Sequence, residues 1–264
     1  MARRLGQFLD RSHDRWHWIL GVRFQDKPEG NVHRDIGLKF GLRARIFCPK
    51  KSANVRLPTP AGSASSPNSM QRLKIGILGS GKGSNFRAIL TEIQNGRLDA
   101  DPVAVLADVE SAGILNLARE AGIPAHVINE PRYRTRLSPE VEEDVVRILQ
   151  AAGVELVVLA GYMRMVKPPL LEAFPRRVIN IHPALLPKFP GLESWRQALE
   201  AGEATSGCTV HFVDGGMDTG EIIARSEVPV LAGDSAGSLH ARIQVAEHVL
   251  YPEVIRRFAA RELP

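Results

Sequence analysis

Three polar residues in this 264-residue chain have the types and spacing needed for chemistry at a carbonyl carbon. Asn180 and His182 end an apolar run, and Asp218 follows in a glycine-rich stretch. An amide can polarise a carbonyl, an imidazole can protonate a leaving group, and a carboxylate can orient the imidazole. Because alternate residues of a strand project to one face, Asn180 and His182 are expected to act together.

The surroundings of this trio leave alternatives open. His182 alone could be a structural residue, although the Pro-rich loop after it favours catalysis, since rigid turns position residues. Residues 214–220 could equally be a turn capped by an aspartate, with Asp214 and Asp218 as the candidates. We interpret His211 as a support for the site. Two cysteines are too few for a disulfide framework or a zinc site, and no metal is predicted.

A second cluster, Gly-Ser-Gly-Lys-Gly-Ser-Asn at residues 79–85, follows the first apolar run and opens a helix. Backbone amides and the helix dipole at such a position suit a phosphate. The loop differs from Walker A, which needs Ser or Thr after Gly-Lys, and its third glycine comes one position early for the dinucleotide pattern. It therefore predicts a site for one phosphate, with a tight strand-to-helix turn as the alternative.

The elements that must position these residues alternate along the chain. Short apolar runs predict strands, the first four buried on both faces, at residues 75–78, 103–107, 154–160, 178–181, 209–213 and 221–230. Helices are predicted after a Ser111 cap, after Ser138 with Pro139 in the first turn, and over residues 235–259. The fold class is therefore α/β, a doubly wound, mostly parallel sheet with helices on both faces and ligands at the carboxyl ends of its strands.

Composition predicts a cytoplasmic protein with one catalytic domain. With 44% hydrophobic and 24% charged residues, the chain can bury a sizeable core. It has no apolar run long enough to cross a membrane and does not open on a secretory signal. The net charge of +5 arises in residues 1–70, where 13 basic residues face 5 acidic ones. The remainder is slightly acidic, so the charge gives no reason to expect a nucleic-acid partner.

The domain boundary is predicted at a linker rich in Pro, Ser and Gly at residues 57–68. Residues 1–69 are interpreted as a basic, disordered extension, or as sequence upstream of a natural start at Met70. Residues 70–264 then form the catalytic domain.

These motifs together resemble the folate-dependent formyltransferases. The resemblance covers about residues 72–261 and rests on the trio, on residues 81–85 and on Glu-His-Val-Leu-Tyr-Pro at 247–252. It is strongest to the branch that formylates the amine of 5-phosphoribosyl-glycinamide in purine synthesis, with 10-formyltetrahydrofolate as cosubstrate. It implies catalytic roles for Asn180, His182 and Asp218.

The resemblance also implies two sets of binding residues. Those for the ribonucleotide are Gly81, Gly83, Ser84, Asn85, Gln244 and Glu247. Those for the folate are Arg136, Met163, Arg164, Met165, Val166, Asn180, Asp214, Gly215, Gly216, Met217 and Asp218.

Three other functions share some of these features. A formyltetrahydrofolate hydrolase has the same trio but lacks this kind of phosphate loop, and a methionyl-tRNA formyltransferase has a further tRNA-binding domain. A non-catalytic ribonucleotide-binding module would not need the trio. The expected partners are the two small-molecule substrates, without nucleic acid or membrane, and a homodimer is compatible with the sequence.

Overall fold

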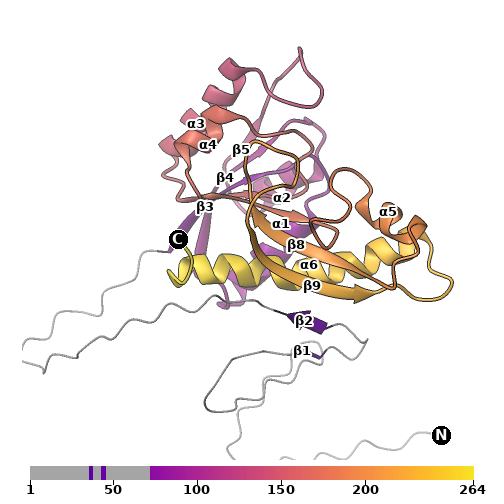
Figure 1. Ribbon diagram of the computed structural model, residues 1–264. Helices are drawn as coiled ribbons and strands as arrows, with labels where there is room; N and C mark the ends of the chain where they lie inside the picture. Colours follow the sequence, from indigo (N-terminus) through magenta and orange to yellow (C-terminus); the bar gives the residue numbers. More distant parts are fainter. Residues whose placement is uncertain (1–35, 38–42, 46–71) are drawn as a thin grey trace, which may run out of the picture.

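The computed structural model describes residues 36–37, 43–45 and 72–264, which form an α/β fold around one nine-stranded sheet (Figure 1). The strands are β1 (Ile36–Gly37), β2 (Arg43–Arg45), β3 (Leu73–Leu78), β4 (Ala100–Ala107), β5 (Ala125–Val127), β6 (Leu156–Leu159), β7 (Val178–His182), β8 (Thr205–Phe212) and β9 (Ile222–Pro229). The helices are α1 (Ser84–Gln94), α2 (Gly113–Glu120), α3 (Pro139–Ala151), α4 (Pro168–Ala173), α5 (Ser194–Glu200) and α6 (Ala236–Ala259).

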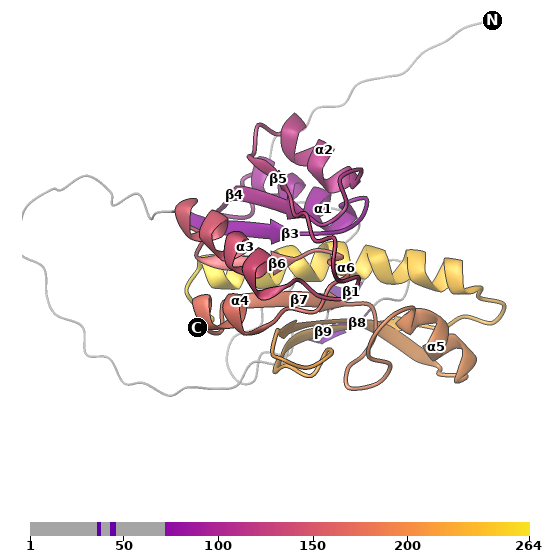
Figure 2. The same ribbon diagram turned by 90° about the horizontal axis from the view of Figure 1, so that it is seen from above.

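The sheet has a parallel part and an antiparallel part. Its strand order is β1-β2-β9-β8-β7-β6-β3-β4-β5, and the strands from β7 to β5 are parallel to one another. β8 and β9 continue the sheet beyond β7 in antiparallel pairing. Figure 2 shows these two strands, with α5, at the end opposite β4 and β5. The expected α/β class, including strands added late in the chain, is confirmed.

Helices cover both faces of the sheet and enclose two hydrophobic cores. On one face α1, α2 and α6 pack over strand residues such as Ile75 and Ile77. On the other face α3 and α4 cover Leu78 and Leu106. Strands buried on both faces must be apolar at every position, which is why continuous apolar runs identified them.

Two of the three helix starts agree with the sequence signals. Ser138 precedes α3, and the Ser235 side chain accepts a hydrogen bond from the backbone N–H of Ser238 at the start of α6. The expected cap of α2 was wrong, because Ala112 and not Ser111 is the N-cap. A carbonyl of the glycine-rich loop replaces a side-chain cap there, since the Ile114 N–H donates to Gly81 at 3.1 Å.

Most of the amino-terminal segment lies outside the described residues, so the boundary at residue 70, the linker at 57–68 and the disordered extension stay predictions. Its two described pieces are β1 and β2, and β2 pairs antiparallel with β9. In the described part of the chain, no helix combines the length and apolar character needed to span a membrane.

Candidate active site

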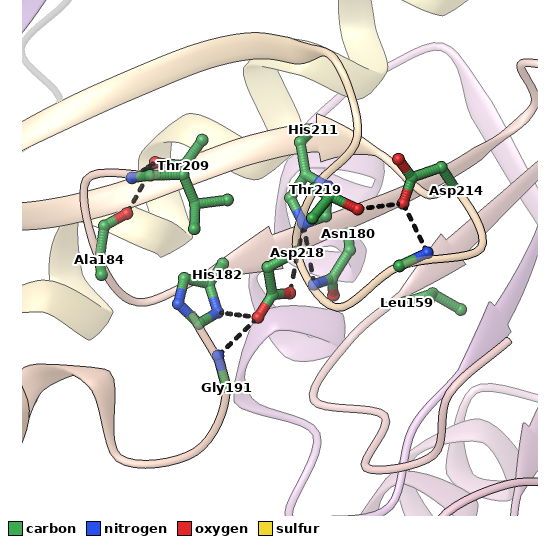
Figure 3. A network of polar contacts seen from close by, with 12 residues as sticks. Leu159, Asn180, His182, Ala184, Gly191, Thr209, His211, Asp214, Asp218 and Thr219 are labelled. Carbon is green, nitrogen blue, oxygen red and sulfur yellow. Dashed lines mark hydrogen bonds and ion pairs between the residues drawn. The ribbon is translucent and has the colours of Figure 1, made fainter. Parts of the chain in front are cut away.

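The site lies where the parallel and antiparallel parts of the sheet meet. Asn180 and His182 stand two residues apart on β7, and Asn180 pairs in register with His211 of the antiparallel strand β8. The His182 side chain is 5% exposed. β7 thus brings the amide and the imidazole to one face of the sheet at the carboxyl end of this strand, as the sequence predicted (Figure 3).

Asp218 reaches His182 from the loop between β8 and β9. One carboxylate oxygen, Oδ2, lies 3.3 Å from His182 Nδ1, and the other lies 3.6 Å from His211 Nε2. Asp218 has a φ of 55°, in the left-handed region that a non-glycine residue rarely adopts. Asp214 instead accepts hydrogen bonds from the Gly216 N–H and the Thr219 hydroxyl of its own loop. The structure therefore separates an aspartate facing the histidine from one that caps the turn.

The loop after β7 contacts both members of this pair. The Phe189 carbonyl lies 2.8 Å from His182 Nε2, and the Gly191 N–H donates to Asp218 Oδ2 at 2.8 Å. A neutral imidazole can donate from only one nitrogen, whereas the charged ring can donate to the carbonyl and the carboxylate together. This arrangement favours a protonated His182.

Burial opposes that charge. It lowers the pKa of His182, while the Asp218 carboxylate and the Phe189 carbonyl act in the other direction without fully cancelling it. Burial also tends to raise the pKa of Asp218, but His211, the Gly191 N–H and His182 outweigh it and hold that pKa below its usual value. The carboxylate is thus ionised at neutral pH, and its charge is the main support for an imidazolium at His182.

His211 lies beside both the Asn180 amide and the Asp218 carboxylate. Its Nδ1 lies 2.8 Å from the Phe212 carbonyl, and its Nε2 lies 3.6 Å from Asp218 Oδ1. Asn180 Nδ2 lies 3.3 Å from that Nε2. With the His211 proton on Nδ1, one Asn180 amide hydrogen donates to Nε2 and the second can donate to a substrate oxygen.

The glycine-rich loop joins β3 to α1, and Gly83 is the N-cap of that helix with a φ of 78°. No side chain caps the start of α1 with a hydrogen bond, so the backbone amides of its first turn can bind an anion. Asn85 donates to the Glu247 carboxylate of α6 at 3.0 Å, and burial raises the pKa of Glu247 to about 7 although Asn85 opposes this. Gln244 lies one turn earlier on the same helix. The structure therefore brings together the two segments proposed for the ribonucleotide.

The residues implied for folate lie on four segments, namely Arg136, residues 163–166, Asn180 of β7 and residues 214–218. Met163 and Met217 are exposed, at 59% and 53%, on the loops that follow β6 and β8. Met165 donates its backbone N–H to Thr135 and pairs with Arg136, so Arg136 is held beside this segment. Two implied side chains do not face open space. Val166 is 5% exposed in the core, and the Arg164 guanidinium is engaged with Asp108.

Sequence reasoning missed Asp108 and the Phe189 carbonyl. Asp108 directly follows β4, where a parallel sheet commonly places functional groups, and that position was its only signal. The role of Phe189 depends on a backbone atom, which its side chain does not reveal. Within the described residues, no three His, Cys, Asp or Glu side chains come together as metal ligands.

One α/β sheet thus places an amide and a histidine at the carboxyl end of β7, a carboxylate from the loop between β8 and β9, and a glycine-rich loop at the start of α1, an arrangement suited to an enzyme that acts on a carbonyl group. Residues 73–255 match the family model described as formyl transferase, and the chain belongs to this family.

Similar proteins agree with this assignment. The chain is 44% identical over 197 residues to the trifunctional purine biosynthetic protein adenosine-3 of Drosophila pseudoobscura pseudoobscura, covering 74% of this chain but only 14% of that protein. It is 38% identical to the phosphoribosylglycinamide formyltransferase of Escherichia coli, covering 71% and 87% of the two chains. The structure of glycinamide ribonucleotide transformylase 1 from Symbiobacterium toebii is similar with a TM-score of 0.70 and 46% identity, over 75% of this chain and 94% of that one.

Proposed function

We propose that this enzyme transfers the formyl group of 10-formyltetrahydrofolate to the amine of 5-phosphoribosyl-glycinamide. The observation that carries the proposal is the buried hydrogen bond between Asn85 and Glu247. It joins the proposed phosphate loop to α6 at the carboxyl ends of the parallel strands, where Asn180 and His182 also lie. A phosphorylated amine held there would lie beside the groups that activate a carbonyl, and the names of the relatives agree with that substrate.

The ribonucleotide is assigned to the region between the carboxyl end of β3, the start of α1 and α6. Gly81, Gly83, Ser84 and Asn85 would hold its phosphate with backbone amides at the start of α1. Gln244 and Glu247 would contact the ribose and glycinamide part. Because β3, β6 and β7 are adjacent strands, the phosphate loop and His182 are about 10 Å apart across the sheet, a span that one small ribonucleotide can bridge.

The folate is assigned to the opposite side of the trio. Met163 and Met217 offer exposed apolar side chains on the loops that follow β6 and β8, and residues 163–166 and 214–218 would read the pterin with backbone groups. Arg136, exposed beside Met165, would pair with the carboxylates of the glutamate tail.

The proposed reaction forms one carbon–nitrogen bond and breaks another. The neutral amine of the ribonucleotide attacks the formyl carbon, the carbonyl oxygen becomes an oxyanion, and folate N10 leaves. The free Asn180 amide hydrogen and the charge on His182 stabilise the oxyanion. Over the whole step the amine loses one proton and folate N10 gains one. His182 donates the proton to N10, either directly or through a water molecule.

His182 must exchange a partner to do this. Both of its ring nitrogens lie next to protein acceptors, Phe189 and Asp218. Donating directly to substrate therefore requires that one of these contacts be replaced when the formyl group binds. Apo geometry of this kind is compatible with catalysis, because catalytic hydrogen bonds often tighten only in the substrate complex.

The test is a formyl-transfer assay of the purified chain with and without the ribonucleotide. Turnover of formyltetrahydrofolate should need the ribonucleotide, because only a bound, oriented amine makes the attack effectively intramolecular. Asn180→Ala and His182→Ala should each lower turnover about a hundredfold or more while leaving the circular dichroism spectrum unchanged. Brisk release of formate without ribonucleotide would instead establish a hydrolase.

The cytoplasm as location and a homodimer as assembly stay predictions. Light scattering coupled to size-exclusion chromatography can decide the second.

A further inference from the structure

We propose that Asp108 is a positioning residue that sets the affinity for the folate tail through Arg164. The inference rests on the proposed function, because it concerns the segment that would hold the cosubstrate. Asp108 follows β4 and Arg164 follows β6, so two loops that are 56 residues apart in sequence meet in this contact.

The contact between Asp108 and Arg164 is short and shielded from solvent. Arg164 Nε donates to Asp108 Oδ2 at 2.6 Å, and the two side chains are 10% and 7% exposed. A guanidinium in such a place needs a counter-charge, since removing one partner leaves the other buried and uncompensated. Asp108 therefore keeps the Arg164 side chain inside the protein, and it also makes the guanidinium unavailable as a direct ligand.

The same guanidinium holds the backbone that carries Arg136. Arg164 Nη1 donates to the carbonyl of Tyr133 and, at 3.1 Å, to the carbonyl of Arg136. The Met165 N–H donates to the carbonyl of Thr135 at 2.8 Å, which adds a further hydrogen bond between the two segments. One buried side chain thus fixes the path of the Arg136 segment against residues 163–166.

A second anchor holds the rest of this segment. The Glu130 carboxylate accepts from the backbone N–H groups of Arg132 at 2.7 Å and Ser138 at 2.6 Å. Between these anchored points Arg136 is exposed, with its guanidinium carbon 4.3 Å from the centre of the Tyr133 ring. Arg136 is therefore exposed on a loop that Arg164 holds by hydrogen bonds, and Asp108 keeps Arg164 in place.

Asp108→Asn tests this chain of contacts, because it keeps the side-chain shape and removes the charge. Arg164 should then favour solvent and release the carbonyls of Tyr133 and Arg136. We expect the KM for 10-formyltetrahydrofolate to rise about tenfold, with kcat and the ribonucleotide KM within about twofold of the wild type. With 10-formyltetrahydropteroate, which ends before the glutamate, the same variant should match the wild type.

Asp234→Asn is the matched control. Asp234 and Arg242 form another shielded pair, 2.7 Å apart and 4% and 19% exposed, at the start of α6. Losing that pair should lower the melting temperature without changing the ratio of KM values for the two cosubstrates. Arg164→Lys serves as a second variant if Asp108→Asn does not fold, because it keeps the charge beside Asp108 but cannot span both carbonyls.

The outcomes separate this inference from the proposed function. A selective rise in KM for the glutamate-bearing cosubstrate, in either variant, supports a positioning role. An unchanged KM, or an equal rise for both cosubstrates, overturns it while the wild type remains an active transferase. A wild-type chain that neither binds nor turns over 10-formyltetrahydrofolate overturns the proposed function and this inference together.

Discussion

Replacing Asp218 by asparagine should lower the pKa of His182 and move the pH dependence of turnover. The variant keeps the size of the side chain and can still accept a hydrogen bond from the Gly191 N–H. It removes the negative charge that faces His182 Nδ1 at 3.3 Å. Burial, which already lowers the pKa of His182, then acts with less opposition.

The size of the effect follows from the geometry. Unit charges about 4 Å apart interact by about 4 kcal/mol at an effective dielectric constant near 20, equivalent to about three pKa units. The side chains are 5% and 14% exposed, so solvent screens part of this interaction, and the Phe189 carbonyl remains in place. We therefore expect the pKa of His182 to fall, by less than this unscreened figure. The protonated fraction above that pKa falls about tenfold for each unit.

Two measurements check this prediction. Because the protonated ring is the required form, the alkaline limb of the kcat profile should move to lower pH, and turnover at pH 7.5 should fall at least about tenfold. An NMR titration of the His182 ring, assigned with His182→Ala, reports the pKa without substrates. Asp214→Asn removes a charge from the same loop that does not face His182, and should leave that pKa unchanged. An unaltered His182 pKa in the Asp218 variant would reduce Asp218 to a turn residue.

Three further predictions concern other parts of the chain. Glu247→Gln should make the free energy of unfolding less dependent on pH. Burial raises the pKa of Glu247 from 4.5 to about 7. Between these pH values the folded wild type keeps a proton that its unfolded chain has lost, so the wild type becomes less stable as the pH rises. The free energy of unfolding of the wild type should therefore decline by about 3 kcal/mol more than that of the variant over this range, measured by urea titration at several pH values. Ser84→Glu should weaken ribonucleotide binding in calorimetry through like-charge repulsion and leave folate binding intact, whereas equal loss of both would contradict a phosphate site. Removing residues 1–69 should leave kcat and both KM values unchanged, because every proposed site residue lies between Gly81 and Glu247, and reduced turnover would show that the extension takes part.

The parallel part of the fold could be predicted from the sequence because burial on both faces leaves a continuous apolar run in each strand. Leu156–Leu159 shows this, since all four of its residues are apolar and buried. β5 could not be found in this way. It has only three residues, Ala125–Val127, none of them fully buried, and it is a strand because of its pairing with β4.

The site was predictable where it depends on local spacing and not where it depends on tertiary contacts. The period of two placed Asn180 and His182 on one face. The choice of Asp218 over Asp214 came from resemblance alone, because it depends on a left-handed backbone at Asp218 and on how the loop folds back. The engagement of Arg164 by Asp108 could not be foreseen, since nothing in either local sequence specifies a partner 56 residues away.

The boundary between parallel and antiparallel strands also divides the proposed site between two parts of the chain. The parallel strands β3 and β7 carry the glycine-rich loop, Asn180 and His182. Asp218 and Glu247 come from later elements, and the Tyr251 hydroxyl of α6 lies 2.9 Å from the Leu159 carbonyl oxygen and 3.0 Å from that of Ile179. The groups proposed to stabilise the oxyanion therefore depend on a carboxylate supplied from beyond the parallel part. A complete site requires the pairing of β7 with β8, which joins the two parts of the sheet.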